Sequence, residues 1–287
     1  MLKRNKPFGN TKSPVLYLVG TPIGNLQDIS QRAIEVLKSV DIIACEDTRN
    51  TSFLLKNLGI ENKKIISCYS QKEKEEGKKI IAMMLNDNLS VAYVSDAGNP
   101  GISDPGAILC SMAIEEDIPV TAVLGPSAFV HALITSGFDT SDFSFYGFLP
   151  VKENMKKDFL KQLKERKETL IFYESLHRID KTLLSMSEVF GQDRRAVVSR
   201  ELSKMHEEYL RGTLKELSDF PEDAKRGEFV IVVEGADESE KTTDDDNIVK
   251  SIKEYLDKGY SLKESVGIVS DELGLRKNYV YNIAKKL

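Results

Sequence analysis

Short apolar runs alternate with amphipathic segments along most of this chain, and this alternation limits the possible folds more than any other feature. The first runs have the length and composition of buried strands: residues 15–19, 41–45, 65–68, 91–95 and 120–124. Between the first two lies a segment whose helical spacing places Ile29, Ala33 and Val36 on one face. Strands that alternate with helices are typical of an α/β fold with a largely parallel sheet.

A second series of strand-like runs begins after Ser136-Gly137. Its members are residues 143–148, 169–173, 196–199 and 229–233, with a basic helix expected near 153–167 and another helix near 179–190. This change in pattern predicts a domain boundary within 125–137. We therefore expect two α/β domains, at residues 14–126 and 127–235.

The last part of the chain differs from both domains. Residues 236–247 are polar, acidic and without periodicity, so they are predicted to form a linker. Residues 248–287 contain three short amphipathic segments, which predict a small helical module. The apolar positions of these segments are Ile248, Ile252, Tyr255 and Leu256, then Leu262, Val266, Val269 and Leu273, then Tyr279, Val280, Ile283 and Leu287.

Composition excludes several classes of protein. Hydrophobic residues make up 41% and charged residues 30%, as in soluble globular proteins. The apolar runs are far shorter than the roughly 20 residues of a membrane helix. The 3 cysteines have no CxxC spacing, which argues against a disulfide framework and favours a reducing cytoplasm. The net charge of −5 is unusual for a general nucleic-acid binder, although residues 152–167 form a locally basic segment.

Three loops that follow predicted strands are candidates for ligand binding, because ligands sit at the carboxyl ends of parallel strands. They are residues 20–26, 95–106 and 125–128. The second is rich in glycine and proline, and its Asp96 and Asp104 can accept hydrogen bonds from an ammonium group or ribose hydroxyls. A rigid structural loop in which Asp104 caps a helix is the alternative. Neither GxGxxG nor GxxxxGK[ST] occurs, so a dinucleotide fold and a P-loop are not supported.

The three loops, in this order, resemble those of the tetrapyrrole-methylase superfamily of S-adenosylmethionine-dependent methyltransferases. Further motifs resemble one branch, which methylates a cytidine 2′-hydroxyl in 16S rRNA of the small ribosomal subunit. They are Val19-Gly20-Thr21-Pro22-Ile23-Gly24-Asn25-Leu26, Glu46-Asp47-Thr48-Arg49, Glu174-Ser175-Leu176-His177-Arg178, and Arg200-Glu201-Leu202-Ser203-Lys204 with His206-Glu207-Glu208. The resemblance extends from about Pro14 to Gly235.

This resemblance implies two α/β domains of the tetrapyrrole-methylase type, with the cofactor S-adenosylmethionine in a cleft between them, and usually a homodimer. The cofactor-binding residues that it implies are Asp96, Gly98, Ile102, Ser103, Asp104, Ser127 and Ala128, with Phe148 and Leu149 closing over the adenine.

A ribose hydroxyl is a poor nucleophile near neutral pH, so a positioned base is expected to accelerate the transfer by about 10²–10⁴-fold. The catalytic candidates are Glu46, Asp47, Glu174, Arg200 and Glu201, each at or near the end of a predicted strand. A structural ion pair is the alternative for each. The candidates for RNA contacts are Arg49, Arg178, Lys156 and Lys157. No metal is expected, because HExxH is absent and the three histidines are dispersed.

Two other functions compete with RNA methylation. One is a methyltransferase of the same superfamily that acts on a tetrapyrrole-like small molecule. The other is an RNA-binding protein that retains the fold without catalysis. The motifs at Glu46-Asp47-Thr48-Arg49 and Arg200-Glu201-Leu202 favour the RNA branch, and the loop 95–106 argues against a protein that has lost the cofactor.

Overall fold

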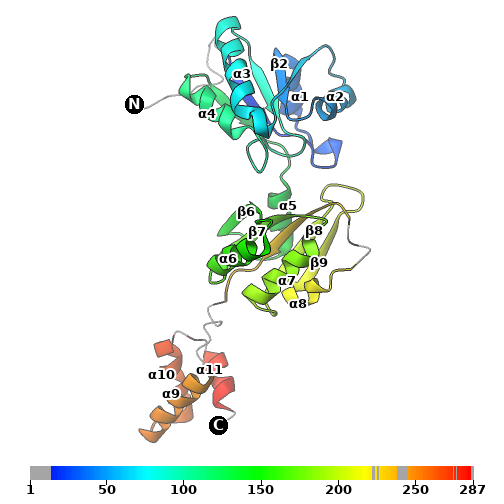
Figure 1. The fold of residues 1–287 in the computed structure, drawn as a ribbon. Helices are drawn as coiled ribbons and strands as arrows, with labels where there is room; N and C mark the ends of the chain where they lie inside the picture. The colour runs from blue at the N-terminus through cyan, green and yellow to red at the C-terminus, as the bar shows by residue number, and fades with distance from the viewer. Residues whose placement is uncertain are drawn as a thin grey trace.

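The computed structural model describes residues 14–221, 224, 226–237, 245–273, 275 and 277–285. Two α/β domains follow each other along the chain, and a group of helices lies beyond them (Figure 1). The expected α/β class is confirmed. Within the described ranges, no helix has the length and apolarity that crossing a membrane requires.

The first domain is built on a five-stranded sheet with strand order β3-β2-β4-β1-β5, and every pair in it is parallel. Each strand lies within a residue or two of its predicted range: β1 Leu16–Val19, β2 Ile42–Cys45, β3 Lys64–Ser67, β4 Val91–Val94 and β5 Val120–Val123. The intervening helices are η1 Leu26–Asp28, α1 Gln31–Ser39, α2 Thr48–Asn57, η2 Ser70–Lys72, α3 Glu73–Asp87 and α4 Ala107–Glu115.

Helices cover both faces of this sheet, because successive side chains of a strand point to opposite sides. On one face, Ala44 and Tyr93 pack with residues of α3 and α4. On the other face, Ile43 and Val94 pack with residues of α1 and α2. This two-sided burial explains why the strands are continuous apolar runs rather than alternating ones.

The second domain has a five-stranded mixed sheet with strand order β6-β7-β10-β8-β9. Its strands are β6 Phe143–Phe148, β7 Thr169–Ser175, β8 Arg195–Arg200, β9 Glu208–Thr213 and β10 Glu228–Val233. Only β6 and β7 are parallel, so the expectation of a largely parallel sheet is wrong for this domain. For β8 and β9 the physical reason is loop length: a parallel crossover needs about a dozen residues, whereas residues 201–207 can join these strands only as antiparallel neighbours.

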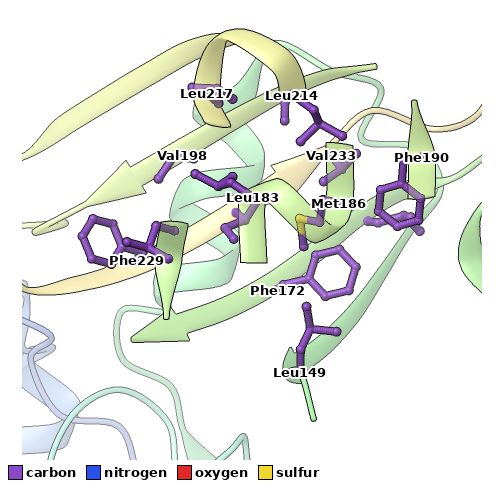
Figure 2. Close-up of a cluster of buried hydrophobic side chains, with 14 of the residues drawn as sticks. Leu149, Phe172, Leu183, Met186, Phe190, Val198, Leu214, Leu217, Phe229 and Val233 are labelled. Carbon is purple, nitrogen blue, oxygen red and sulfur yellow. The ribbon is translucent and has the colours of Figure 1, made fainter. Parts of the chain in front are cut away.

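Helices cover this sheet on both sides as well: α5 Ala128–Ser136, α6 Glu153–Leu163, α7 Ile179–Phe190 and α8 Leu214–Ser218. Phe172, Leu183 and Met186 belong to the large core beneath α6, α7 and α8 (Figure 2). On the other side, α5 contacts β7 and β10. Because α5 packs on the second sheet, we propose that the domain boundary lies at residues 126–127.

The C-terminal helices are α9 Asp245–Asp257, α10 Leu262–Leu273 and α11 Lys277–Ala284. They share a core to which Ile248, Val269 and Val280 contribute, in agreement with the predicted apolar positions; Leu287 lies outside the described residues. α9 begins inside the predicted linker 236–247, because apolar spacing identifies the buried face of a helix and not its first turn.

A buried carboxylate anchors the end of the glycine- and proline-rich loop in the first domain. Glu73, at the start of α3, accepts hydrogen bonds through Oε1 from the backbone N–H groups of Gly106, Ile108 and Leu109, at 2.9, 2.9 and 3.0 Å. Gly106 is the N-cap residue of α4 and has no side chain that caps the helix. Negative charge is favourable at a helix N-terminus, so Glu73 takes the capping role considered for Asp104.

We predict that Glu73→Ala lowers the free energy of unfolding of the first domain by about 2–4 kcal/mol, because three buried N–H groups lose a charged acceptor. Urea titration measures the change. Glu75→Ala is the matched control, since Glu75 is exposed on the same helix and pairs with Lys79. It should change stability by less than about 0.5 kcal/mol. Equal effects of the two substitutions would rule out the capping role of Glu73.

Candidate active site

The loops after β1, β4 and β5 pack against one another at the carboxyl edge of the first sheet. Thr21 and Gly98 form an antiparallel bridge with N···O distances of 2.8 and 3.1 Å. Asn99 joins the second loop to the third: its Nδ2 donates to the carbonyl of Gly125 at 3.2 Å, and its Oδ1 accepts from the N–H of Gly125 at 2.9 Å. Any side chain at Gly20 would collide with the backbone of Gly125, so these loops require glycine for their close approach.

A cavity of about 310 Å³ lies between these loops and one end of the second sheet. The two domains touch around it. A Cβ on Gly147, in the second domain, would lie 3.2 Å from Ser103 Oγ, and a Cβ on Gly24 would lie 3.1 Å from the carbonyl oxygen of Leu202. The cavity is lined by Ile23, Asp96, Ala97, Gly98, Asn99, Ile102, Ser103, Asp104, Ser127, Ala128, Phe148, Tyr173, Glu174, Ser175, Glu201, Leu202, Lys204, Glu228, Phe229 and Val230.

Most of the predicted cofactor residues line this cavity: Asp96, Gly98, Ile102, Ser103, Asp104, Ser127, Ala128 and Phe148. Leu149 does not, and its contact with the cofactor stays a prediction. Its side chain is 3% exposed and packs in the core beside Phe172, as Figure 2 shows, whereas Phe148 remains 56% exposed. Neighbouring side chains at the end of β6 point to opposite sides, so only one of the two can face the cavity.

The first residues of β10 are cavity residues that the sequence pattern does not reveal. Glu228, Phe229 and Val230 line the cavity from the amino end of their strand. They lie at the amino end of a strand, whereas the sequence prediction considered only loops at carboxyl ends. β10 is antiparallel to β7 and β8 and therefore starts where those strands end. The signal available in the sequence is Gly227, a glycine just before an apolar run. In the structure its φ is 81°, and a Cβ at this position would collide with the side chain of Glu201.

Burial and neighbouring negative charges raise the pKa of two carboxyl groups: Asp104, which lines the cavity, and Glu46, which does not. Burial, together with the negative charges of Glu46, Asp96 and Glu228, raises the pKa of Asp104 to about 6. The pKa of Glu46 is also raised, first by burial and then by the charges of Asp96 and Asp47. Glu46 follows β2, which pairs with β4 just before the chain reaches Asp96. This cluster favours a cationic ligand and includes a carboxyl group that can accept a proton.

Asp47, another predicted base, caps α2. Its Oδ1 accepts from the backbone N–H of Arg49 at 2.8 Å, and its Oδ2 lies 2.6 Å from Arg49 Nη2. The hydrogen bonds from Arg49 lower the pKa of Asp47 to about 2. A carboxylate with so low a pKa is a weak base, so the geometry supports a structural role. The side chain of Arg49 is 89% exposed and remains accessible to a phosphate.

Glu174 lines the cavity but holds a buried hydrogen-bond network. Its Oε2 accepts from Thr182 Oγ1 at 2.6 Å, and its Oε1 accepts from the N–H of Ser175 at 2.8 Å. Arg178 Nε lies 3.4 Å from the same Oε1, and Lys156 Nζ donates to Thr182 Oγ1 at 3.2 Å. These contacts favour the structural alternative for Glu174 over a catalytic role.

Two residues predicted to contact RNA, Lys156 and Arg178, belong to this internal network instead. Lys156 is 2% exposed and pairs with Glu153 at 3.0 Å, so its assignment to RNA is wrong. It lies on the buried face of α6, one turn before Leu160. Arg178 Nη2 donates to the carbonyls of Leu149 and Pro150 at 2.8 and 3.1 Å, so it holds the turn that follows Phe148.

The remaining predicted residues lie in ion pairs. Lys157 of α6 pairs with Glu188 of α7 at 2.5 Å, and Arg200 pairs with Glu208 across β8 and β9. Glu201 lines the cavity and accepts from Lys204 at 2.9 Å. The structure therefore brings Glu201 to the cavity, whereas Lys157 lies away from it.

Comparison with known proteins supports this architecture. A family model described as Tetrapyrrole (Corrin/Porphyrin) Methylases matches residues 15–218. "Ribosomal RNA small subunit methyltransferase I" of Bacillus subtilis is 42% identical over 289 residues and covers 98% of each chain. The protein of the same name from Haemophilus influenzae is 40% identical over 270 residues, with 93% of this chain and 95% of that one covered.

Among solved structures, uroporphyrin-III-C-methyltransferase from Thermus thermophilus has a similar fold. Its TM-score is 0.55 at 17% identity, with 77% of this chain and 94% of that chain covered. The family match and the two-domain fold agree with the sequence motifs. The chain therefore belongs to the tetrapyrrole methylase family and, within it, to the group of the ribosomal RNA small subunit methyltransferases I.

Proposed function

We propose that this protein transfers a methyl group from S-adenosylmethionine to the 2′-hydroxyl of a cytidine in 16S rRNA of the small ribosomal subunit, in the cytoplasm. The observation that carries the proposal is the interdomain cavity, whose carboxylates and glycine-rich loops suit a cationic nucleoside. The names of the relatives at 40–42% identity support a ribosomal substrate over a tetrapyrrole.

The residues of the cavity fit this cofactor. Asp96 and Asp104 are acceptors for ammonium and hydroxyl groups and attract a positive charge, while Ile102 and Phe148 supply apolar walls. The exposed ring of Phe148 provides a face for the adenine. When bound, the cofactor supplies an electrophilic methyl group on a sulfonium centre.

Glu46 is the residue best suited to act as general base. Its raised pKa gives the carboxylate more basicity than an ordinary glutamate. It follows β2, whose last residue pairs with Val94, and it feels the charge of Asp96, which lines the cavity. In this role it would accept the proton that the ribose hydroxyl loses when its oxygen displaces the cofactor's sulfur from the methyl carbon. The carboxylate of Asp47 caps α2, and the carboxylate of Glu174 is held in a buried hydrogen-bond network. Neither is therefore placed to accept the proton.

The first experiment is transfer of a labelled methyl group from S-adenosylmethionine to undermethylated small ribosomal subunits, followed by nucleoside analysis. We expect label in 2′-O-methylcytidine. Glu46→Gln should lower kcat by about 100-fold and leave cofactor affinity within about twofold. Glu35→Gln, an exposed change on α1, is the control. A parallel reaction supplies a tetrapyrrole in place of the subunits; label in the tetrapyrrole and none in RNA would refute the proposal and support the small-molecule alternative.

The affinity for S-adenosylmethionine should depend on pH through Asp104. Burial and the charges of Glu46, Asp96 and Glu228 raise its pKa to about 6, so the carboxyl group is neutral below that pH and an acceptor with full charge above it. A cationic ligand prefers the ionised form. Affinity should therefore fall by about tenfold as pH is lowered from 7 to 5. Calorimetry at both pH values measures this, and Asp104→Asn should bind weakly at pH 7 with little further loss at pH 5. An equally steep loss in Asp104→Asn would assign the titration to another group.

We also propose a homodimer. Exposed apolar side chains occur on α4, after β5, on α5 and on β6: Ile108, Ile114, Leu124, Val130, Ile134 and Phe143. β5 and β6 are edge strands of their sheets, and exposed apolar groups at such edges favour protein–protein contact.

Sedimentation equilibrium should give twice the chain mass of 32.2 kDa. Ile134→Glu should shift the protein toward monomer, because a charge in an apolar interface is costly. Leu184→Glu, at an exposed apolar position of α7, should not. A wild-type protein that stays monomeric across the concentration range would exclude the dimer.

A further inference from the structure

A second cavity, also of about 310 Å³, lies beside α2. The loop after β1 forms one wall through Thr21, Pro22, Gly24 and Leu26, and α2 forms the other. We call this cavity the α2 groove; the residues that α2 and the loop after β4 contribute to it are Asn50, Thr51, Phe53, Leu54, Asn57, Ser95 and Asp96.

The α2 groove meets the cofactor cavity at Asp96, whose residue lines both. The loop after β1 separates them elsewhere: its Ile23 faces the cofactor cavity, while Pro22 and Gly24 face the groove. Asn50 Nδ2 donates to Asp96 Oδ2 at 2.9 Å, which ties α2 to this junction. A ligand in the groove therefore lies next to the place where the methyl donor binds.

The groove has the side chains that recognise a nucleobase. Phe53 is 72% exposed, so its ring offers a face on which a base can stack. Asn50 and Asn57 lie one turn before and one turn after it on the same side of α2. Their Nδ2 groups donate to Asp96 and to the carbonyl of Phe53, so their amide oxygens are the atoms that can accept a hydrogen bond from a base. Arg49 precedes them, with an exposed guanidinium at the start of the helix that can pair with a phosphate.

We propose that the α2 groove holds the base of the target nucleotide, turned out of the RNA, so that its ribose lies at Asp96 between the groove and the cofactor cavity. This inference rests on the proposed function and adds the substrate site to it. An RNA base that is splayed out and stacked on an aromatic ring is the usual object of sequence-specific RNA recognition. With the nucleobase in the groove, the ribose hydroxyl, the methyl donor and the proposed general base Glu46 would meet near Asp96.

The test uses the full-length protein, labelled S-adenosylmethionine and undermethylated small ribosomal subunits. Phe53→Ala should lower kcat/KM for the subunits by about tenfold or more, because a stacked base loses its platform. Cofactor affinity, measured by calorimetry, should stay within about twofold of wild type. Phe53→Trp should restore most of the activity, since indole also stacks. The high exposure of Phe53 makes either change compatible with folding.

Leu85→Ala is the matched control. Leu85 is also an exposed apolar residue of the first domain, but it lies on α3, which covers the opposite face of the sheet from α2. It should leave kcat/KM for the subunits unchanged.

Two negative results have different meanings. If wild-type protein methylates the subunits and Phe53→Ala does so equally well, the groove does not hold the base, and the proposed function stands without it. If wild-type protein binds S-adenosylmethionine and places no label in RNA, the proposed function fails and this inference fails with it.

Discussion

The site depends on the close contact of Gly20 with Gly125 at the carboxyl edge of the first sheet. This contact excludes any side chain, and Asn99 holds it through two-way hydrogen bonds with Gly125. The bridge between Thr21 and Gly98 joins the loop after β4 to the loop after β1. Because the three loops are fixed together, the walls of both cavities form before a ligand arrives, and less entropy is lost on binding.

Two buried carboxylates extend this rigidity to each side of the cofactor cavity. Glu73 holds the end of the loop 95–106 by capping α4. In the second domain, Glu174 anchors Arg178, which binds the carbonyls of the turn after Phe148. Each carboxylate has donors that compensate its burial, so these charges stabilise particular loop positions rather than reacting with substrate. The carboxyl groups left for chemistry, Glu46 and Asp104, are those whose pKa is raised.

Much of the fold could be predicted, because apolar runs with a strand's length report burial directly. All strands of the first sheet lie within a residue or two of the ranges that the apolar runs predict, and α7 has its predicted range. β9 was not, because Glu208–Thr213 is an edge strand with charged and polar residues. The individual site residues were harder: Lys156 belongs to a basic run, yet helical geometry turns this one lysine into the core.

By itself the sequence determined the α/β class, the order of the elements and the glycine-rich loops, since local periodicity and backbone freedom are properties of short segments. The tertiary structure alone decided which carboxylates are buried in networks and which remain to titrate. It also brought the amino end of β10 to the cavity and separated the α2 groove from the cofactor cavity by a single loop. Those features depend on strand direction and on contacts between residues far apart in the chain, which no local pattern encodes.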